Sequence, residues 1–478
     1  MPAPDRHRCR HKKAERGVLS ASRIEYRITD TKGIYLMKMQ YGFDDKVPAG
    51  KAVPWALQYV FTIFTGAMTG SIMLASGIGL DAEQTAFLIQ CGLLACGVAT
   101  LIHSFGLKIG GFQIGARLPL VSAGSYTLIT PMILFATDPN IGISGAFGAA
   151  ILGTALLFLV GPLVVEKLYD FFTPAVTGSV VLAVGMCLIL NAWNSMVDYA
   201  PTSPDALKFF IIGIVVAALC IIIDHFAKGL LQSLAILVVL AAGYIFCAVT
   251  GMVDFSALKE AAWVSLPRPL AFGFSINIGA IVTVMIVHIA TMMEECGNTT
   301  GVVSAVTDQS IPPKETLKGA IRGDGLGGVF SSLFNALPVC IAAQNSGIVM
   351  MSGVASRFVT GIAGAIFVIM AIFPKFSQLL ALIPGPVLGG VLLVIFGNTI
   401  ASGIKVIGFD QMTKRNLTIV AMATSIGIGG NFAQQAGLLV FLPATVVTLF
   451  TGISGTAVTA LLLNLVLPGR PKKGKETK

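Results

Sequence analysis

The sequence predicts an all-α polytopic membrane protein, and three observations carry that prediction: the composition, the long apolar stretches and two internal repeats. Of the 478 residues, 55% are hydrophobic and only 12% are charged. The mean hydropathy is +0.84. An ordinary soluble domain carries about 25% charged residues, so the composition excludes that class.

Long apolar stretches give the number of spans. The stretches that begin at Trp55, Phe209 and Ser233 reach or approach the length that crosses a bilayer as a helix, roughly 20 residues. Between Val53 and Leu467 the chain has room for about 14 such spans joined by short loops. An arrangement of about 12 spans is the alternative.

Charge predicts the orientation. The formal net charge of +9 is concentrated in the amino-terminal segment and in the tail PGRPKKGKETK. Because cytoplasmic segments of membrane proteins are enriched in Lys and Arg, we expect both termini in the cytoplasm and an even number of spans. This distribution does not suggest nucleic-acid binding.

The cysteines show neither a CxxC pair nor Cys/His metal spacing, so we expect free core thiols and no metal, cofactor or disulfide framework. They are Cys9, Cys91, Cys96, Cys187, Cys220, Cys247, Cys296 and Cys340.

Residues 1–50 differ from the rest of the chain. They are basic and polar, and they lack the apolar core of about 7 to 15 residues that a signal peptide needs. We expect a disordered cytoplasmic extension. The alternative is an upstream start codon, with Met37 or Met39 as the natural first residue.

Two pairs of similar segments indicate an internal duplication. LPLVSAGS at 118–125 recurs in outline as LPVCIAAQ at 337–344, which aligns Leu118 with Leu337. PAVTGSVVLAVG at 174–185 matches PVLGGVLLVIFG at 386–397, which aligns Pro174 with Pro386. The two pairs have similar offsets and occur in the same order along the chain. Paired segments interrupted by Gly and Pro are typical of transporters built from repeats.

The duplication predicts a seven-span repeat over residues 51–252 and a second over residues 270–467, followed by a basic tail at 468–478. Because seven is odd, the second repeat enters the membrane with the opposite orientation. The repeat is therefore inverted, which is the geometry of alternating access.

The paired Leu-Pro segments are the candidate ligand site. Pro removes a backbone donor and the small residues that follow weaken a helix, so both spans should be interrupted. Backbone groups freed inside a membrane must line a cavity or meet a ligand. Gly124 and Gly347 would allow close approach, and the amides of Gln344 and Asn345 suit a flat ligand edge. The alternative is that these amides only tie helices together.

Ionisable residues inside spans are functional candidates. Glu294 and Glu295 point about 100° apart on a helix, so one is expected to face the cavity and the other to lie at the water interface. A carboxylate at this depth can accept two N–H donors and can carry a proton. The alternative is a structural carboxylate paired with Arg322 or Lys318.

Asp324 lies in a glycine-rich stretch whose GxGxxG pattern has no βαβ context, so a dinucleotide site is excluded. Asp324 is either a turn residue or a second carboxylate that shapes the Glu294 site.

Several other polar residues are interpreted as structural. We expect His103 and His288 to be lone core or interfacial histidines. Asp224 and His225 are expected in a loop. Arg357 is expected to be a cytoplasmic interfacial anchor or a helix-end cap.

The motif QNSGIVMMSGVASR closely resembles the signature of the nucleobase-ascorbate transporter family, also called nucleobase:cation symporter-2. Its signature positions are Gln344, Asn345, Gly347, Ser352 and Gly353, and Ser352 stands where Thr is usual.

Other segments resemble further elements of the same family. EECGN matches a Glu-x-x-Gly element, with Asn298 where an acid or His is commoner, and GDG at Asp324 resembles a further acidic position. GARLPLVSAGSYT aligns Ser125 and Tyr126 with a third-span motif. ALQY resembles Ala-Leu-Gln-His, but Tyr59 replaces the His, so the role of that His is open here. The likeness runs from about YGFDDKVPAGKA to the last span.

This resemblance implies the same seven-plus-seven inverted repeat, a core domain and a gate domain, short extended segments in spans 3 and 10, and a homodimer. It also implies a set of site residues. The substrate-binding residues would be Glu294, Gln344, Asn345, Ser125, Tyr126 and Ala343, and the residues for proton coupling or support would be Glu294, Asp324 and Asn298.

The implied function is import of an oxidised purine, xanthine or uric acid or both, by proton symport with alternating access in the cell membrane. Gln rather than Glu at position 344 separates this branch from uracil carriers, which stay the alternative within the family. No obvious carboxylate and carbonyl cage favours Na⁺. From other classes, an anion transporter or channel would need cationic groups at the broken segments, and a membrane enzyme would need a triad or HExxH spacing that is absent from the sequence.

Overall fold

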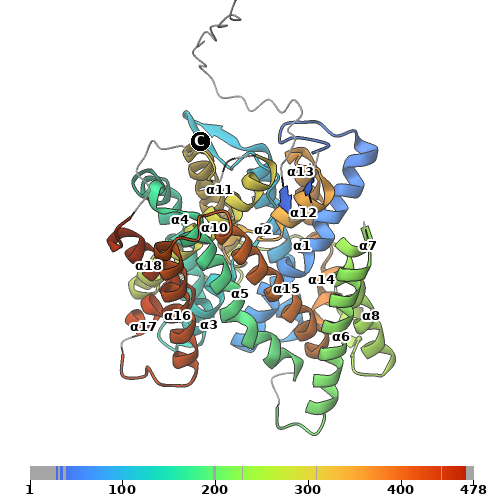
Figure 1. The fold of residues 1–478 in the computed structure, drawn as a ribbon. Helices are drawn as coiled ribbons and strands as arrows, with labels where there is room; N and C mark the ends of the chain where they lie inside the picture. The colour runs from blue at the N-terminus through green and yellow to red at the C-terminus, as the bar shows by residue number, and fades with distance from the viewer. Residues whose placement is uncertain are drawn as a thin grey trace, which may run out of the picture.

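The computed structural model describes residues 28–30, 33–35, 39–197, 201–228, 230–307, 309, 311–442 and 444–469. Most of the predicted extension at 1–50, including Met37, and most of the predicted tail at 468–478 lie outside these ranges. Within them the chain is mostly helical, and Figure 1 shows the helices packed side by side in one bundle.

Seven helices of the described ranges are long and apolar enough to cross a membrane, and an eighth span would be the pair α13 and α14, bent by 87°. The prediction of an all-α, multi-pass membrane protein is therefore confirmed. The seven are α1 (Ala49–Ile78), α2 (Ala82–Phe105), α4 (Gly142–Leu168), α5 (Pro174–Met196), α6 (Ala206–Phe226), α10 (Ile278–Val306) and α15 (Gly385–Ile407); the bent pair is α13 (Arg357–Met370) and α14 (Pro374–Ala381).

Shorter or less apolar elements make up the rest. The helices are α3 (Ile129–Thr137), α7 (Leu230–Ser233), α8 (Ala235–Val249), α9 (Ser256–Glu260), α11 (Lys314–Leu333), α12 (Asn345–Ser352), α16 (Lys414–Gln435), α17 (Ala444–Phe450) and α18 (Gly452–Val466), with 3-10 turns η1 (Tyr126–Leu128) and η2 (Tyr169–Phe171). The strands pair as three antiparallel ribbons: β1 (Ile28–Asp30) with β2 (Gly33–Tyr35), β3 (Leu107–Ile109) with β4 (Phe112–Ile114), and β5 (Ser122–Gly124) with β6 (Val339–Ile341).

Two local predictions are wrong. Asp224 and His225 lie in the last turn of α6 rather than in a loop. The glycine-rich stretch around Asp324 is helical and belongs to α11, so Asp324 is not a turn residue. Glycine lowers helix propensity, but here it lets α11 pack closely: a Cβ at Gly325 would lie 2.7 Å from the Cα of Phe158 on α4.

The helices pack in two groups. In one group α5 packs along α15, and α6, α16 and α18 surround that pair. In the other group α2 packs against α1, α11 and α13, while α4 packs against α11. Helix α10 contacts both groups, since it packs against α4, α5, α12 and α18. The boundary between the two groups therefore runs along α10.

Helices α5 and α15 cross with their backbones in near contact. A Cβ at Gly185 would lie 2.6 Å from the carbonyl oxygen of Phe396, and a Cβ at Gly403 would collide with the backbone of Leu182. Contacts of 185 with 396 and of 182 with 403 mean that the helices run antiparallel. These are the two helices that begin with the repeated Pro-x3-Gly motif.

The predicted breaks at the Leu-Pro segments are observed as strands β5 and β6. These strands pair antiparallel, with Ser122 opposite Ile341, Ala123 opposite Cys340 and Gly124 opposite Val339. In the sequence repeat, the alignment of Leu118 with Leu337 also places Ser122 at the position of Ile341. Ser122 and Ile341, which are equivalent in the repeat alignment, thus face each other across the ribbon.

A short extended segment near the amino terminus holds the chain that leaves α12. The amide of Ala355 donates to the carbonyl of Tyr41 at 2.9 Å. Arg357, buried at the start of α13, donates through Nε to Asp44 at 2.6 Å and through a terminal nitrogen to the carbonyl of Ser104 at 3.0 Å. Arg357 is therefore structural, as predicted.

The close crossing of α5 and α15 can be tested with two alanines on one helix. Gly403→Ala should lower the thermal stability of the purified protein, because overpacking against the backbone of Leu182 costs about 1–3 kcal/mol. Gly397→Ala is the matched control, since a Cβ there meets nothing within 4 Å. Equal melting temperatures for the two variants would contradict the observed packing.

Candidate functional site

Each broken segment runs from a strand into a helix. After β5 the chain turns at Ser125 into η1 and α3, and after β6 it turns at Gln344 into α12. The amide of Ser125 donates to the carbonyl of Pro338 at 2.7 Å, and the amide of Ala342 donates to the carbonyl of Val121 at 3.0 Å. Because the strands are antiparallel, the two helices leave the ribbon in opposite directions and their first turns flank its two ends.

A small cavity of about 30 Å³ lies at this ribbon. It is about the size of one water molecule, so the site is contracted in this conformation. Five of the six predicted substrate-binding residues line it. The lining comprises Ile63, Gly66, Ala123, Gly124, Ser125, Tyr126, Val184, Glu294, Cys340, Ile341, Ala342, Ala343, Gln344 and Thr399.

Glu294 is the acidic group of this cavity. It lies on α10 and accepts a hydrogen bond through Oε2 from the hydroxyl of Thr127 at 2.8 Å. Neither proposed structural partner pairs with it: Arg322 donates to the carbonyl of Gln113, and Lys318 pairs with carboxylates at the surface. The alternative of an ion pair at Glu294 is therefore wrong.

Glu295 points away from the cavity, as helical geometry predicts, but it does not lie at the water interface. Glu294 and Glu295 are 7% and 1% exposed, so both are buried. The carboxyl group of Glu295 contacts that of Asp324 on α11.

Polar groups in the cavity wall are available to a ligand. The carboxamide of Gln344 is half-buried and makes no hydrogen bond to another described residue. The hydroxyl of Ser125 is buried and likewise has no partner among the described residues. The hydroxyl of Tyr126 is occupied, since it donates to the carbonyl of Gly66 at 3.1 Å, so Tyr126 presents its ring and backbone.

Asn345 does not line this cavity, because its amide is used to join the two broken segments. Its Nδ2 donates to the carbonyls of Val121 and Ala342, both at 2.8 Å, and its Oδ1 accepts from the amide of Val121 at 3.0 Å. All three bonds are buried. The position of Asn345 is that of a support for the site.

Asp324 and Asn298 hold β6 from the other side. Asp324 Oδ2 accepts from the amide of Ile341 at 3.3 Å, and Asn298 donates to the carbonyl of Ile341 at 2.7 Å. Asp324 also contacts His103 on α2 through Oδ1 and Nε2 at 2.8 Å. His103 is therefore a core histidine, as predicted, although its acidic partner was not foreseen, and His288 is a core histidine bonded to Thr154 and Thr291.

The remaining signature residues shape and end α12. Ser352 Oγ accepts from the amide of Val354 at 3.1 Å, and Gly353 ends the helix in the left-handed conformation with φ of 66°. Gly is the residue that adopts this φ without strain. Gly347 faces a second cavity of about 270 Å³, which Gln344 also lines.

Three other features concern residues at or near the site. Tyr59 is buried on α1, its hydroxyl has no partner among the described residues, and it does not line the small cavity.

All seven described cysteines are free and buried. No group of His, Cys, Asp and Glu in the described ranges has the arrangement of a metal site.

Sequence reasoning missed Thr127 and His103. Thr127 stands two residues after Ser125, so its position just past the broken segment was a usable signal. His103 gave only the signal of a polar residue in an apolar span, and its partner is 221 residues away.

Buried, discontinuous segments with unpaired polar groups between two sets of membrane helices define a membrane transporter rather than a soluble or receptor-like protein. The comparison with known families agrees. Residues 50–436 match the family described as "Permease family". The chain belongs to this family, the xanthine and uric acid permeases of the nucleobase-ascorbate transporters. Its members are permeases, not enzymes.

Curated relatives cover most of the chain. The uric acid permease PucK of Bacillus subtilis is 34% identical over 84% of this chain and 89% of its own length. The uric acid permease PucJ of the same organism is 31% identical over 88% of this chain and 94% of its own. The xanthine permease of Bacillus subtilis is 32% identical over 87% and 94%.

Solved structures share the fold at low sequence identity. The transmembrane domain of the cyanobacterial bicarbonate transporter BicA has a TM-score of 0.54 at 15% identity, covering 88% of this chain and 99% of that one. SLC26A9 gives a TM-score of 0.52 at 13% identity, covering 84% and 65%. At this identity the similarity shows the fold alone.

Adjacent amides in the signature should behave differently on substitution. Asn345→Asp should reduce the yield and thermal stability of the folded protein, because it replaces the donor to two buried carbonyls with a carboxylate, at a cost of about 3 kcal/mol or more. Gln344→Glu should leave stability near that of the unchanged protein. Size-exclusion profiles and melting curves measure both, and a stable Asn345→Asp protein would contradict the support role.

Proposed function

We propose that this protein imports an oxidised purine base, xanthine or uric acid, across the cell membrane by proton symport. The observation that carries the proposal is the small cavity in which Glu294, Gln344 and Ser125 meet exposed backbone between two broken segments. The relatives named as uric acid and xanthine permeases support this substrate class.

The chemistry of the cavity suits such a base. An oxidised purine is planar and alternates N–H donors with carbonyl acceptors along its edge. The Glu294 carboxylate can accept from a ring N–H, and the Gln344 amide can donate and accept at once. Backbone amides at the first turn of a helix donate to carbonyl oxygens and favour partial negative charge. A site of this kind strongly rejects a base that leaves its buried polar groups unpaired.

Four titratable groups support coupling to protons. Glu294 faces the cavity, while Glu295, Asp324 and His103 form a buried cluster that holds β6 through the amide of Ile341. A proton moving among these groups would change the hydrogen bonds that position the strand. Proton binding and base binding would thereby act on the same element.

Alternating access is supported by two features. The antiparallel pairs β5 with β6 and α5 with α15 support an inverted relation between the proposed repeats at 51–252 and 270–467. Such a repeat divides into seven and seven spans, with α3 and α12 as the helical parts of the two broken spans. The group of α1, α2, α4, α10, α11 and α13 would be the core, and the group of α5, α6, α15, α16 and α18 would be the gate.

The rival substrate classes fit the cavity less well. An anion carrier would need a cation at the broken segments, and no Lys, Arg or His lines the small cavity in the described part of the chain. Uracil, the alternative within the family, is smaller and has fewer groups to pair with Glu294 and Gln344.

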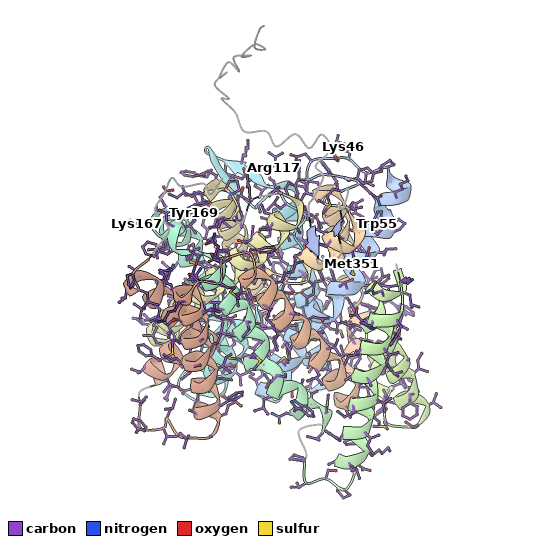
Figure 2. The ribbon with its side chains drawn as sticks, viewed as in Figure 1. Lys46, Trp55, Arg117, Lys167, Tyr169 and Met351 are labelled. Atoms are coloured by element: carbon purple, nitrogen blue, oxygen red, sulfur yellow. The ribbon has the colours of Figure 1, made fainter. Side chains whose placement is uncertain are left out.

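Orientation and assembly also belong to the proposal. Figure 2 places Lys46 and Arg117 at the same end of the bundle. Basic residues gather on the cytoplasmic side, so both termini would face the cytoplasm. Apolar side chains such as Leu207 and Ile221 are exposed on α6, which suits contact with lipid or with a second copy in a homodimer.

Uptake of labelled xanthine by cells that lack their own purine carriers tests the function directly. Accumulation should collapse with a protonophore and should be blocked by unlabelled uric acid more than by uracil. Uptake of uracil alone would contradict the proposed substrate. Accumulation that depends on a Na⁺ gradient would contradict the proposal that the coupling ion is a proton.

The carboxylate in the cavity should be essential. Glu294→Gln should reduce xanthine uptake by about 10-fold or more while the amount of protein in the membrane stays constant, because a charge-assisted hydrogen bond worth about 1.5–3 kcal/mol is lost. Glu83→Gln, exposed at the start of α2, is the matched control and should transport normally. Normal accumulation by Glu294→Gln would refute the role of this residue.

A further inference from the structure

Another cavity, larger than the two already described, lies beside the small one. Its volume is about 440 Å³, and we call it the amide chamber. It is lined by Thr127, Thr130, Pro131, Leu134, Cys187, Leu188, Leu190, Asn191, Asn194, Val287, Asn431, Gln434, Gln435, Thr451, Gly452, Ile453 and Ser454. These residues lie on α3 and α10 on one side and on α5, α16 and α18 on the other, so the chamber sits on the boundary between the two helix groups.

The chamber is polar but carries no charge. Its described lining contains five amide side chains and four hydroxyls, and no Asp, Glu, Lys, Arg or His. Amides offer donors and acceptors together. Such a wall suits a neutral ligand with both kinds of group and offers little to an ion.

Several of these amides are free for a ligand. Asn431 donates to the carbonyl of Cys187 at 3.3 Å, and Gln434 accepts from Thr451 at 2.9 Å. The carboxamides of Asn191, Asn194 and Gln435 make no hydrogen bond to other described residues. Asn191 and Asn194 are half-buried and Gln435 is exposed, so these amides are accessible to a ligand that enters the chamber, and their concentration at one cavity suits a partner with several donors and acceptors.

One side chain joins the chamber to the small cavity. Thr127 lines the chamber, and its hydroxyl donates to Oε2 of Glu294, which lines the small cavity. A ligand that reaches Thr127 would compete for the hydroxyl that now holds Glu294. The chamber therefore leads to the acidic group of the site.

The cavity on the other side of the ribbon differs in chemistry. The 270 Å³ cavity that Gln344 and Gly347 line also contains the charged residues Asp224 and Lys405. The neutral, amide-rich wall is therefore specific to the chamber and is not a general property of the space between the helix groups.

We infer that the amide chamber is a second binding site for the neutral form of the transported base, a planar heterocycle with several amide-like edges, occupied before the base reaches Glu294. This inference rests on the proposed function. The chamber has the volume usual for small-molecule sites, about 300–1,000 Å³, whereas the small cavity in this conformation does not. Figure 1 shows α3 and α17 at the end of the bundle opposite the one where Figure 2 places Lys46 and Arg117, so the chamber lies toward the outside in the proposed orientation.

A cysteine in the chamber wall reports on its occupancy. The native cysteines, Cys187 included, are replaced by alanine, and Asn191→Cys supplies the reporter. A membrane-impermeant cationic methanethiosulfonate is applied to intact cells, and the labelling rate is measured with and without xanthine. Ser402→Cys, in the other cavity, is the control for sidedness and should not label from outside.

The decisive arm repeats this with Gln344→Ala added, which impairs the central site. We expect xanthine at twice its dissociation constant for the chamber to slow labelling about threefold in both backgrounds. Protection that disappears with Gln344→Ala, or that is absent in both backgrounds, overturns the chamber as a binding site.

These outcomes separate the two proposals. If the unchanged protein accumulates xanthine but the reporter shows no protection, the chamber inference alone fails. If xanthine protects the reporter but is not accumulated, the chamber binds the base and the transport proposal fails.

Kinetics give a second readout that does not depend on labelling. In the otherwise unchanged protein, Asn191→Leu with Asn194→Leu should raise the KM for xanthine uptake about threefold or more and change kcat little, because it weakens capture before the central step. Thr424→Val, on α16 outside the chamber, is the control. An unchanged KM in the double variant would contradict the inference.

Discussion

The structure depends on the pairing of β5 with β6. Inside a bilayer every backbone amide and carbonyl needs a partner within the protein, and each Leu-Pro segment leaves several without a helical one. The two segments satisfy each other, and side chains complete the pairing: Asn345 takes both groups of Val121, while Asp324 and Asn298 take both groups of Ile341. Asn345, Asp324 and Asn298 are therefore explained first by backbone satisfaction.

The polar side chains that these backbone hydrogen bonds leave unpaired form the candidate site. Gln344 and Ser125 stand at the ends of the ribbon with no side-chain partner among the described residues, and Glu294 is held by one hydroxyl. Such groups are expensive to bury, so they persist where a ligand repays the cost. The adjacent cluster of Glu295, Asp324 and His103 contacts the same ribbon through the amide of Ile341. The proposed ligand binding and the proposed proton coupling thus involve one small element.

Local sequence signals predicted much of this. The breaks followed from Leu-Pro, the divergence of Glu294 and Glu295 from helical periodicity, and the choice of Glu294 as the cavity residue from the family resemblance. The failures were tertiary. Glycines around Asp324 indicated a loop, but close packing on α4 keeps that stretch helical. His103 looked isolated because its partner is distant in sequence, and Glu295 lies in the interior because Asp324 contacts it there. No periodicity encodes contacts between helices that lie far apart in the sequence.

The β5–β6 ribbon also sets an order of events during synthesis. Ser122 finds its partner only when Ile341, in the other half of the chain, has been made. At a translation rate of roughly 5 to 20 residues per second, that interval is about 10 to 40 seconds. Throughout it the first broken span sits in the insertion machinery or the lipid with an open backbone edge, which a hydrocarbon environment does not tolerate unaided. The first half of the chain therefore cannot complete its own backbone hydrogen bonding, and the final structure of the first broken span forms only after the second half has been inserted.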